Sequence, residues 1–132
     1  MVYYYDTKGR IIYEYTKNDY LNTIDAVESK LDFTGKPEYT ISNHTKTNDL
    51  SLGTQSVRDD YTYDHMGRPL KHEQTLNGVT SKKEVIALNT YDNLGLLTRK
   101  GVGGRYNQNR LQNIDFAYNV RGWLKSINQD SY

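Results

Sequence analysis

The sequence predicts an all-β fold in which consecutive antiparallel β-hairpins form one long, twisted or curled sheet. Three observations lead to this prediction. The chain is rich in tyrosine, a short turn motif with a glycine recurs along it, and apolar residues alternate with polar ones between the copies of the motif. Thirteen of the 132 residues are Tyr, against two Phe and one Trp. Tyrosine favours strands, and no long stretch has the apolar spacing of an amphipathic helix.

The composition also limits the kind of core that the chain can build. Hydrophobic residues make up 36% of the sequence and the mean hydropathy is -0.86, so little apolar surface is available for burial. A tyrosine ring packs while its hydroxyl stays in water. We therefore expect a sheet with one covered face and one solvated face rather than a deep aliphatic core.

The recurring motif is an aromatic residue, Asp or Asn, two variable residues, Gly, a basic or large residue and then an apolar one. The near-complete copies are Tyr5-Asp6-Thr7-Lys8-Gly9-Arg10-Ile11, Tyr63-Asp64-His65-Met66-Gly67-Arg68-Pro69-Leu70, Tyr91-Asp92-Asn93-Leu94-Gly95-Leu96-Leu97 and Tyr118-Asn119-Val120-Arg121-Gly122-Trp123-Leu124. A degenerate copy, Asp32-Phe33-Thr34-Gly35-Lys36-Pro37, is shorter, with a single residue, Thr34, between its aromatic residue and its glycine. The glycines lie 26 to 32 residues apart, a period typical of repeat architectures.

Turn chemistry explains the spacing within each copy. Asp or Asn at the first position of a type I turn accepts a hydrogen bond from the backbone N–H two residues on. Gly three residues later adopts the left-handed conformation that closes a hairpin with a bulge. The motif therefore predicts hairpin tips near 6–9, 33–36, 64–67, 92–95 and 119–122. The predicted turn residues are Asp6, Gly9, Gly35, Asp64, Gly67, Asp92, Gly95, Asn119 and Gly122.

Alternation between the tips predicts the strands, and together they make a single repeat array over residues 1–132. The expected strands are 2–6, 10–16, 27–33, 37–45, 57–64, 69–76, 84–92, 96–100, 111–118 and 123–128. The expected connections between hairpins are longer and polar, at 17–26, 46–56, 77–83 and 101–110. The run Gly101–Gly104 fits a flexible connection better than a phosphate cradle, since no Lys-Ser/Thr follows it.

Charge and residue content argue against several classes of partner. Seventeen basic and 16 acidic residues give a net charge of +1 without a block of like charges, so nothing indicates nucleic acid. No apolar run is long enough for membrane insertion, and the absence of cysteine excludes a disulfide framework. The start of the chain lacks the pattern of a signal peptide and lies inside a repeat, so we expect a segment of a larger protein.

Candidate catalytic and metal sites have simpler explanations. His44, His65 and His72 lack acidic or cysteine companions at recognised ligand spacing, so we expect surface positions and no metal or other cofactor. The carboxylates of the tips are explained as turn acceptors rather than as acid/base groups, and no catalytic residue is predicted.

The tyrosines leave one alternative open. Aromatic rings on an exposed sheet face can stack on sugars or on partner proteins, although packing within the sheet explains them as well. The candidate binding residues are Tyr61, Tyr63, Tyr91, Tyr106, Tyr118 and Trp123.

The five tips together resemble the YD repeats of the Rhs family, whose signature is Tyr-Asp-x-x-Gly-Arg at irregular spacings. The resemblance spans essentially the whole chain, and stretches such as Tyr63–Arg68 and Arg121–Asn128 are similar to long Rhs-repeat proteins of Bacteroidetes. In that family and in the similar shells of teneurins and toxin complexes, hairpins join into a ribbon that coils into a hollow shell. Two departures stand out: the second tip lacks the Tyr-Asp pair, and Leu96 replaces the basic residue after Gly95.

The resemblance implies a structural or interaction module of a bacterial cell-surface or secreted protein, a wall segment without catalysis of its own. Its main partner would be the rest of the parent Rhs protein, and a glycan or a surface protein is the alternative partner. We also expect the chain to associate with itself, because a ribbon has unpaired edge strands.

Overall fold

The structure is a computed structural model that describes residues 1–49, 51 and 53–128. Leu50 and Leu52, within the predicted connection 46–56, and residues 129–132 of the predicted array lie outside the described residues. Across the described residues, ten strands and one turn of 3₁₀ helix follow one another. They are β1 (Val2–Tyr5), β2 (Ile11–Asn18), β3 (Thr23–Leu31), β4 (Pro37–Lys46), β5 (Thr54–Tyr63), β6 (Pro69–Leu76), η1 (Thr80–Lys82), β7 (Glu84–Tyr91), β8 (Leu97–Val102), β9 (Gln112–Tyr118) and β10 (Leu124–Ile127).

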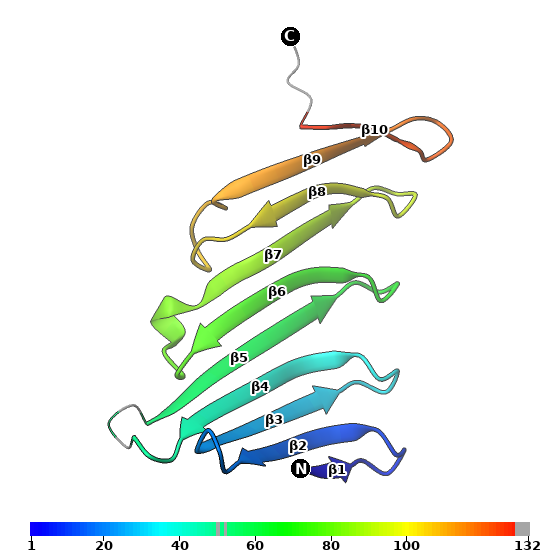
Figure 1. Cartoon of the computed structure of the whole chain (residues 1–132). Helices are drawn as coiled ribbons and strands as arrows, with labels where there is room; N and C mark the ends of the chain where they lie inside the picture. Colours follow the sequence, from blue (N-terminus) through cyan, green and yellow to red (C-terminus); the bar gives the residue numbers. More distant parts are fainter. Residues whose placement is uncertain (50, 52, 129–132) are drawn as a thin grey trace. The chain divides into compact units, whose positions relative to one another are not determined.

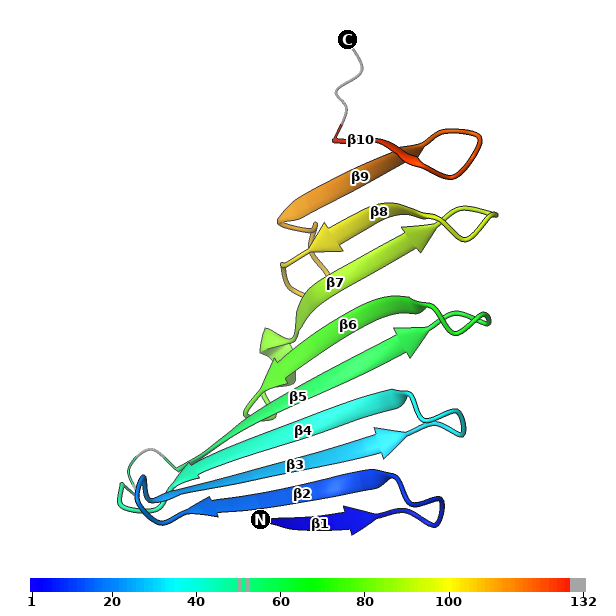
Figure 2. The ribbon, with the colours of Figure 1, turned by 45° about the vertical axis from the view of Figure 1, so that its right-hand side comes forward.

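The strands follow the order of the chain in one antiparallel sheet, from β1 to β10 (Figure 1). The predicted all-β fold of consecutive hairpins is therefore confirmed. Two compact units make up the chain. The first is Met1–Tyr61 with Gln74–Lys83, and the second is Thr62–Glu73 with the residues from Glu84 onward. In the first unit the β1–β2 and β3–β4 tips lie at the same end of their strands, and in the second unit the other three tips do so (Figure 2).

Several strands extend further into the connections than expected. Residues predicted as the loop 17–26 belong largely to strands, because β2 runs to Asn18 and β3 begins at Thr23. Asn22, with φ of 53°, tightens the turn between them. Ile24 alternates with polar neighbours, so this part of the chain continues the ladder, and the expected start of the strand at residue 27 was wrong.

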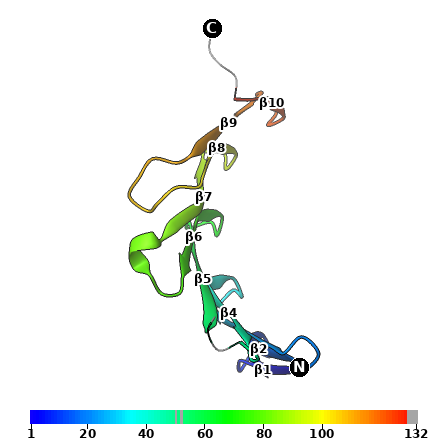
Figure 3. The same cartoon turned by 60° about the vertical axis from the view of Figure 1, so that its left-hand side comes forward.

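The connection between β8 and β9 also differs from the expectation. It spans residues 103–111 rather than 101–110, since Gly101 and Val102 belong to β8. A side chain at Gly101 would meet Cγ of Arg110 at 2.6 Å. Arg110 crosses this glycine and donates hydrogen bonds to the carbonyl oxygens of Gly104, Arg105 and Gln108. The 103–111 connection and η1 stand out from the strands in Figure 3.

One internal register is common to the hairpins β1–β2, β3–β4, β7–β8 and β9–β10. The residue before the tip Asp or Asn pairs with the residue two positions after the glycine, and the register shifts beside that pair. The pairs are Tyr5 with Ile11, Leu31 with Pro37, Tyr91 with Leu97 and Tyr118 with Leu124. This is the bulge that the glycine turn was expected to produce.

We call the junctions between hairpins seams, and a second register is common to the seams β2–β3, β4–β5 and β8–β9. The residue four positions after one tip glycine pairs with the residue three positions before the aromatic position of the next tip. The pairs are Tyr13 with Glu28, Tyr39 with Asp60 and Arg99 with Asp115. The connections at these seams differ in length, from residues 19–22 to residues 103–111, so their length does not determine the register.

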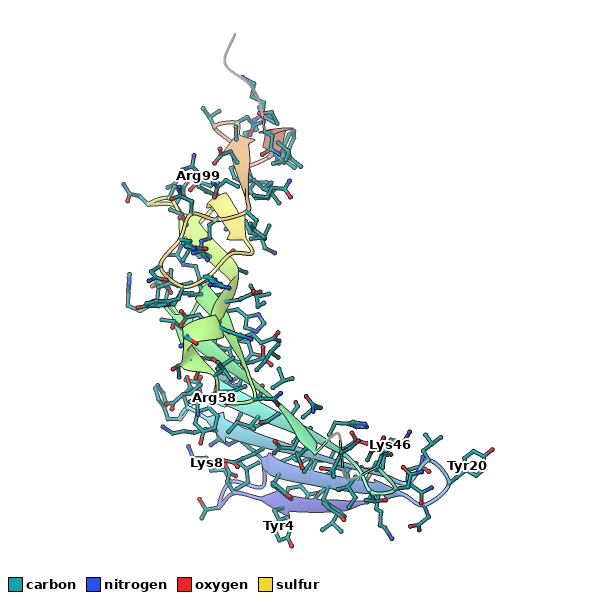
Figure 4. All side chains as sticks on the ribbon, turned by 90° about the vertical axis from the view of Figure 1, so that its left-hand side faces the viewer. Tyr4, Lys8, Tyr20, Lys46, Arg58 and Arg99 are labelled. Atoms are coloured by element: carbon teal, nitrogen blue, oxygen red, sulfur yellow. The ribbon has the colours of Figure 1, made fainter. Side chains whose placement is uncertain are left out.

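Little of the sheet is buried. Among the described residues, Val85 is the buried hydrophobic residue, with Glu73 and Thr75 as buried polar ones. Side chains extend from both faces of the strands in Figure 4. The sheet therefore depends on its ladder hydrogen bonds and on cross-strand pairs, such as the edge-to-face contact of Tyr4 with Tyr13 at 5.7 Å between ring centroids.

Candidate functional site: a clasp between hairpin tips

Each tip is organised by its Asp or Asn. In the first tip, Oδ1 of Asp6 accepts hydrogen bonds from the backbone N–H of Lys8 at 2.8 Å and of Arg10 at 2.9 Å. The backbone N–H of Gly9 donates to the Asp6 carbonyl at 3.0 Å, and Gly9 has φ of 76°. Asp32, Asp64, Asp92 and Asn119 make the same two side-chain contacts in their own tips.

The second tip is regular, which corrects the sequence interpretation. Its turn begins at Asp32, one residue before the predicted 33–36, and Gly35 donates to the Asp32 carbonyl at 3.2 Å. Phe33 is an exposed residue of the turn and does not occupy the aromatic position. Leu31 stands there, as its pairing with Pro37 shows. Aligning on the aromatic residue rather than on the Asp-x-x-Gly spacing concealed this register.

The basic residue after the glycine connects one tip to the next. In the first unit, Nε of Arg10 donates to Oδ2 of Asp6 at 2.6 Å, and Nη1 donates to the carbonyl of Asp32 in the next tip at 2.9 Å. Lys8, labelled in Figure 4, reaches the same tip, with Nζ 3.3 Å from the carbonyl oxygen of Phe33. Asp6 therefore holds the Arg10 side chain in a direction that bridges two hairpins.

The same bridge recurs in the second unit. Nε of Arg68 donates to Oδ2 of Asp64 at 2.6 Å, and Cζ lies 4.6 Å from the centroid of the Tyr91 ring in the next tip. A Cβ on Gly95 would lie 2.7 Å from Nη1 of Arg68. Glycine is therefore needed at position 95 for two reasons: its φ is 84°, and the Arg68 side chain lies where a Cβ would be.

The tyrosine before the tip Asp or Asn donates a hydrogen bond to the preceding hairpin. The Tyr91 hydroxyl donates to the carbonyl of Pro69 at 2.9 Å, and the Tyr118 hydroxyl donates to the carbonyl of Leu97 at 2.8 Å. Both acceptors stand two residues after the glycine of the preceding tip. We call this arrangement the tip clasp. The residue after the glycine covers the glycine of the next tip, and the tyrosine hydroxyl of that next tip donates a hydrogen bond to the carbonyl two residues after the first glycine.

Leu96 shows what the clasp retains without a basic residue. Its Cδ1 lies 3.9 Å from the place where a Cβ on Gly122 would be, which is ordinary van der Waals contact. Tyr118 still makes its hydrogen bond across this seam. The departure at Leu96 therefore replaces the charged part of the clasp with an apolar contact and leaves the register unchanged.

Hydrogen bonding lowers the pKa of three tip carboxylates, those of Asp6, Asp32 and Asp64. The backbone N–H of Arg10 lowers the pKa of Asp6, and its side chain adds to this effect against partial burial. The Thr34 hydroxyl lowers the pKa of Asp32, together with the backbone N–H groups of its turn. Partial burial raises the pKa of Asp64, but hydrogen bonds from Arg68 and Met66 more than offset it, so that this pKa also lies below its ordinary value.

The candidate binding aromatics have different surroundings. Tyr91 and Tyr118 use their hydroxyls in the clasp. Tyr106 lies in the 103–111 connection, where Nζ of Lys71 is 5.2 Å from its ring centroid. Trp123 stands at the fifth tip and is exposed, whereas Tyr61 and Tyr63 are half-buried.

A hollow in the first unit was not predicted. It measures about 500 Å³ and lies beside η1. Arg58, labelled in Figure 4, donates two hydrogen bonds to Oδ1 of Asp60 and covers the Tyr39 ring at 4.2 Å. Nζ of Lys83 lies 3.7 Å from Oδ2 of Asp60. These groups come from β4, β5 and the segment after η1, so only the fold brings them together. The hollow is lined by Ile41, Ser56, Arg58, Asp60, Thr75, Gly78, Thr80 and Lys83.

The residues that line this hollow include no histidine. His44 and His65 are exposed, and His72 is half-buried. Nδ1 of His44 lies 2.6 Å from Oδ1 of Asp25, a cross-strand partner that sequence spacing did not reveal. No group of three or more His, Cys, Asp and Glu side chains suited to a metal ion occurs in the part of the chain that the structure describes.

Comparisons with known proteins add no family. No protein-family model matches the chain, and no curated protein matches it either. The described residues also contain no helix with the length and apolar character needed to cross a membrane.

Proposed function

We propose that this chain is a structural repeat module of the Rhs/YD kind, a wall segment of a bacterial cell-surface or secreted protein without catalysis of its own. The observation that carries the proposal is the tip clasp. Every part of the Tyr-Asp-x-x-Gly-Arg signature has a place in it, as the contacts of Arg68 with Asp64, Tyr91 and Gly95 illustrate. The residues that carry the family resemblance therefore join hairpins to one another.

Exposed apolar residues at the tips support a role inside a larger wall. Turns at a protein surface are usually polar. Four of the five tips here carry a large apolar residue in the turn itself. These residues and their exposed fractions are Phe33 at 84%, Met66 at 70%, Leu94 at 85% and Val120 at 102%. In a coiled wall, a neighbouring part of the parent protein would cover them.

The chemistry of the tips supports a role without catalysis. A general acid or base needs a carboxylate that is available to a substrate and has a suitably shifted pKa. The carboxylates of Asp6, Asp32 and Asp64 already accept hydrogen bonds within their own turns and have lowered pKa values. Their geometry is that of turn acceptors.

Electron cryomicroscopy of the natural gene product would test this role. We expect this ribbon to continue through its clasps into flanking hairpins and to form part of a β-wall, with the apolar tip residues covered. A product in which these strands stand as a detached domain, with exposed tips and a ligand in the hollow, would contradict the proposal.

The hollow beside η1 favours a second candidate function, carbohydrate binding. Sugar sites combine an aromatic ring with hydroxyl and charged groups that accept and donate hydrogen bonds. Here Ser56, Thr80 and Arg58 help to line the hollow, and the Tyr39 ring, which is not itself part of the lining, lies under Arg58. A glycan array followed by calorimetric titration tests this candidate. Saturable binding that is lost in Arg58→Ala and kept in Tyr20→Ala, a change at an exposed turn residue, would favour it, and the absence of any binding would remove it.

A further inference from the structure

The connection after β6 begins with Asn77 and Gly78, the one Asn-Gly dipeptide of the sequence, and both residues are exposed. Asn77 has φ of 48° and Gly78 has φ of 69°. The backbone N–H of Val79 donates to the Leu76 carbonyl at 3.0 Å, which closes a four-residue turn. Two consecutive left-handed residues are typical of a type I′ turn, and this turn favours Asn followed by Gly. The turn therefore explains why these two residues are adjacent.

The same dipeptide is chemically reactive. A backbone nitrogen that follows Asn can attack the side-chain carboxamide, and glycine hinders the attack least because it has no Cβ. The Gly78 nitrogen loses its proton and bonds to Cγ of Asn77, while the Cγ–Nδ2 bond breaks and Nδ2 leaves as ammonia with that proton. Water then opens the resulting succinimide ring at one of its two carbonyls. The product at position 77 is aspartate or isoaspartate, and water is the only co-reactant.

The fold holds the Asn77 carboxamide against strand β5. Oδ1 of Asn77 accepts a hydrogen bond from the backbone N–H of Ser56 at 2.7 Å, and Nδ2 donates to Oε1 of Gln55 at 3.0 Å. The backbone N–H of Asn77 also donates to the Ser56 carbonyl at 2.7 Å. Ring closure requires Cγ to reach the Gly78 nitrogen, so the carboxamide must first leave both of its partners on β5.

The second unit contains the same arrangement without the glycine. Asn128 also has φ of 48°, its backbone N–H donates to the Asp115 carbonyl at 2.8 Å, and its Oδ1 accepts a hydrogen bond from the Asp115 N–H at 2.8 Å. Gln129 follows Asn128 in the sequence, and a residue with a Cβ hinders the attack in any conformation. Asn128 therefore provides an internal reference in which the hydrogen bonding is matched and the reactive neighbour is missing.

We infer that Asn77 is a deamidation site whose reactivity is controlled by the base of the β5–β6 hairpin, the end at which Asn77 contacts Ser56. The closed base protects the carboxamide, and opening of the base lets Gly78 attack. Isoaspartate then lengthens the main chain by one carbon between residues 77 and 78, so the hydrogen bonds with Ser56 no longer align and the base stays open. The modification is thus an irreversible record of local opening, in a sheet with little buried apolar surface.

Peptide mapping by mass spectrometry tests the protection. The full chain is incubated in mildly alkaline buffer with and without urea, and deamidation is followed at positions 77 and 128. We expect Asn77 to react at least about tenfold more slowly in the folded chain than in urea, because closure keeps both side-chain hydrogen bonds. In urea Asn77 should react faster than Asn128, since only Asn77 precedes a glycine. Equal rates at Asn77 with and without urea, or equal rates at the two positions in urea, would overturn the inference.

Two variants separate the hairpin base from the rest of the chain. Gln55→Ala removes the acceptor of Nδ2 and should speed deamidation of the folded chain about fivefold, the effect of one typical hydrogen bond. The control Gln108→Ala, at an exposed residue of the 103–111 connection, should leave the rate unchanged. In urea the two variants and the parent should react at one common rate. A folded Gln55→Ala chain that reacts no faster than the parent would contradict control by the base.

Amide hydrogen exchange at Ser56 tests the consequence of the modification. The purified isoaspartate form should lose protection of the Ser56 N–H. Asn77→Asp carries the same added charge on an unaltered main chain, and its carboxylate can still accept this hydrogen bond, so protection should remain. Equal protection of Ser56 in the isoaspartate form and in Asn77→Asp would show that the base closes again after modification, against the inference.

Discussion

The guanidinium carbon of Arg68 lies 4.6 Å from the ring centroid of Tyr91, although the two residues belong to different hairpins. Arg68 donates a hydrogen bond to the Asp64 carboxylate, and the Tyr91 hydroxyl donates one to the carbonyl of Pro69, the residue after Arg68. A sequence motif that closes one turn therefore also fixes the position of the next turn. The sheet gains a contact at its tips that its small amount of buried apolar surface does not provide.

Removing one tyrosine hydroxyl from the clasp should weaken the sheet. Tyr118→Phe leaves the Leu97 carbonyl without its hydroxyl donor, and we expect the free energy of unfolding to fall by about 1 kcal/mol. Urea unfolding followed by circular dichroism measures the change. Tyr20→Phe is the matched control because Tyr20 is exposed in the β2–β3 turn. Equal stability of the Tyr118→Phe variant and the parent would argue against the clasp.

The contact between Arg68 and Gly95 should appear as coupling in a double-mutant cycle. Gly95→Ala strains a residue with φ of 84°, at a cost of about 1–2 kcal/mol, and it also displaces Arg68 from the Tyr91 ring. In the Arg68→Ala background only the strain remains. We therefore expect the cost of Gly95→Ala to fall by about 0.5–1 kcal/mol when Arg68 is absent.

Gly9→Ala provides the reference for this cycle. Gly9 has a similar φ of 76°, but a Cβ there meets nothing within 4 Å. Its cost should be unaffected by Arg68→Ala. If the costs of Gly95→Ala are the same with and without Arg68, the arginine does not act on the next tip.

Stability should decrease in acid because the carboxylates of Asp6, Asp32 and Asp64 have lowered pKa values. In the folded chain the pKa of Asp64 lies below the unfolded value of about 3.9, so the unfolded chain binds more protons between the two values. The carboxylate therefore stabilises the fold above the unfolded pKa, and this contribution is lost as the pH falls through the folded pKa. Urea midpoints measured from pH 7 down to pH 3 should show this loss.

Asp64→Asn removes the charge at this position but keeps a side-chain oxygen that can accept the hydrogen bonds of the turn. Asn119 occupies the same position in the fifth tip and accepts backbone hydrogen bonds from Arg121 at 2.9 Å and Trp123 at 3.0 Å. We therefore expect Asp64→Asn to keep the hairpin but to make the acid dependence shallower than in the parent. An unchanged pH profile would mean that Asp64 does not contribute to it.

Asp32 and Phe33 should respond differently to substitution. Asp32→Ala removes the acceptor for the backbone N–H groups of Thr34 and Lys36, and we expect a lower urea midpoint. Phe33→Ser changes an exposed turn residue and should leave the free energy of unfolding within about 0.5 kcal/mol of the parent value. If Phe33→Ser instead destabilised the chain more than Asp32→Ala, Phe33 rather than Asp32 would be the residue that stabilises this tip.

Local chemistry explains why the hairpins were predictable. An Asp or Asn three residues before a glycine specifies a turn from neighbouring residues alone, so the tips and most strand boundaries follow from the sequence. Contacts across a seam depend on register, which neighbouring residues do not specify. The approach of Leu96 to Gly122 and the pair of His44 with Asp25 became visible only with the strands paired.

The measurement that tests the account most directly is the strand register at the seams. Interstrand nuclear Overhauser effects of the isotope-labelled chain should connect Arg99 with Asp115, and they should still do so after deletion of Asn107 from the 103–111 connection, because the tips determine the register. The seams of the first unit should show the corresponding contacts, Tyr13 with Glu28 and Tyr39 with Asp60. A one-residue slip at Arg99 after the deletion would turn the β9 side chains to the other face. It would show that the connections, rather than the tip clasps, determine the strand register.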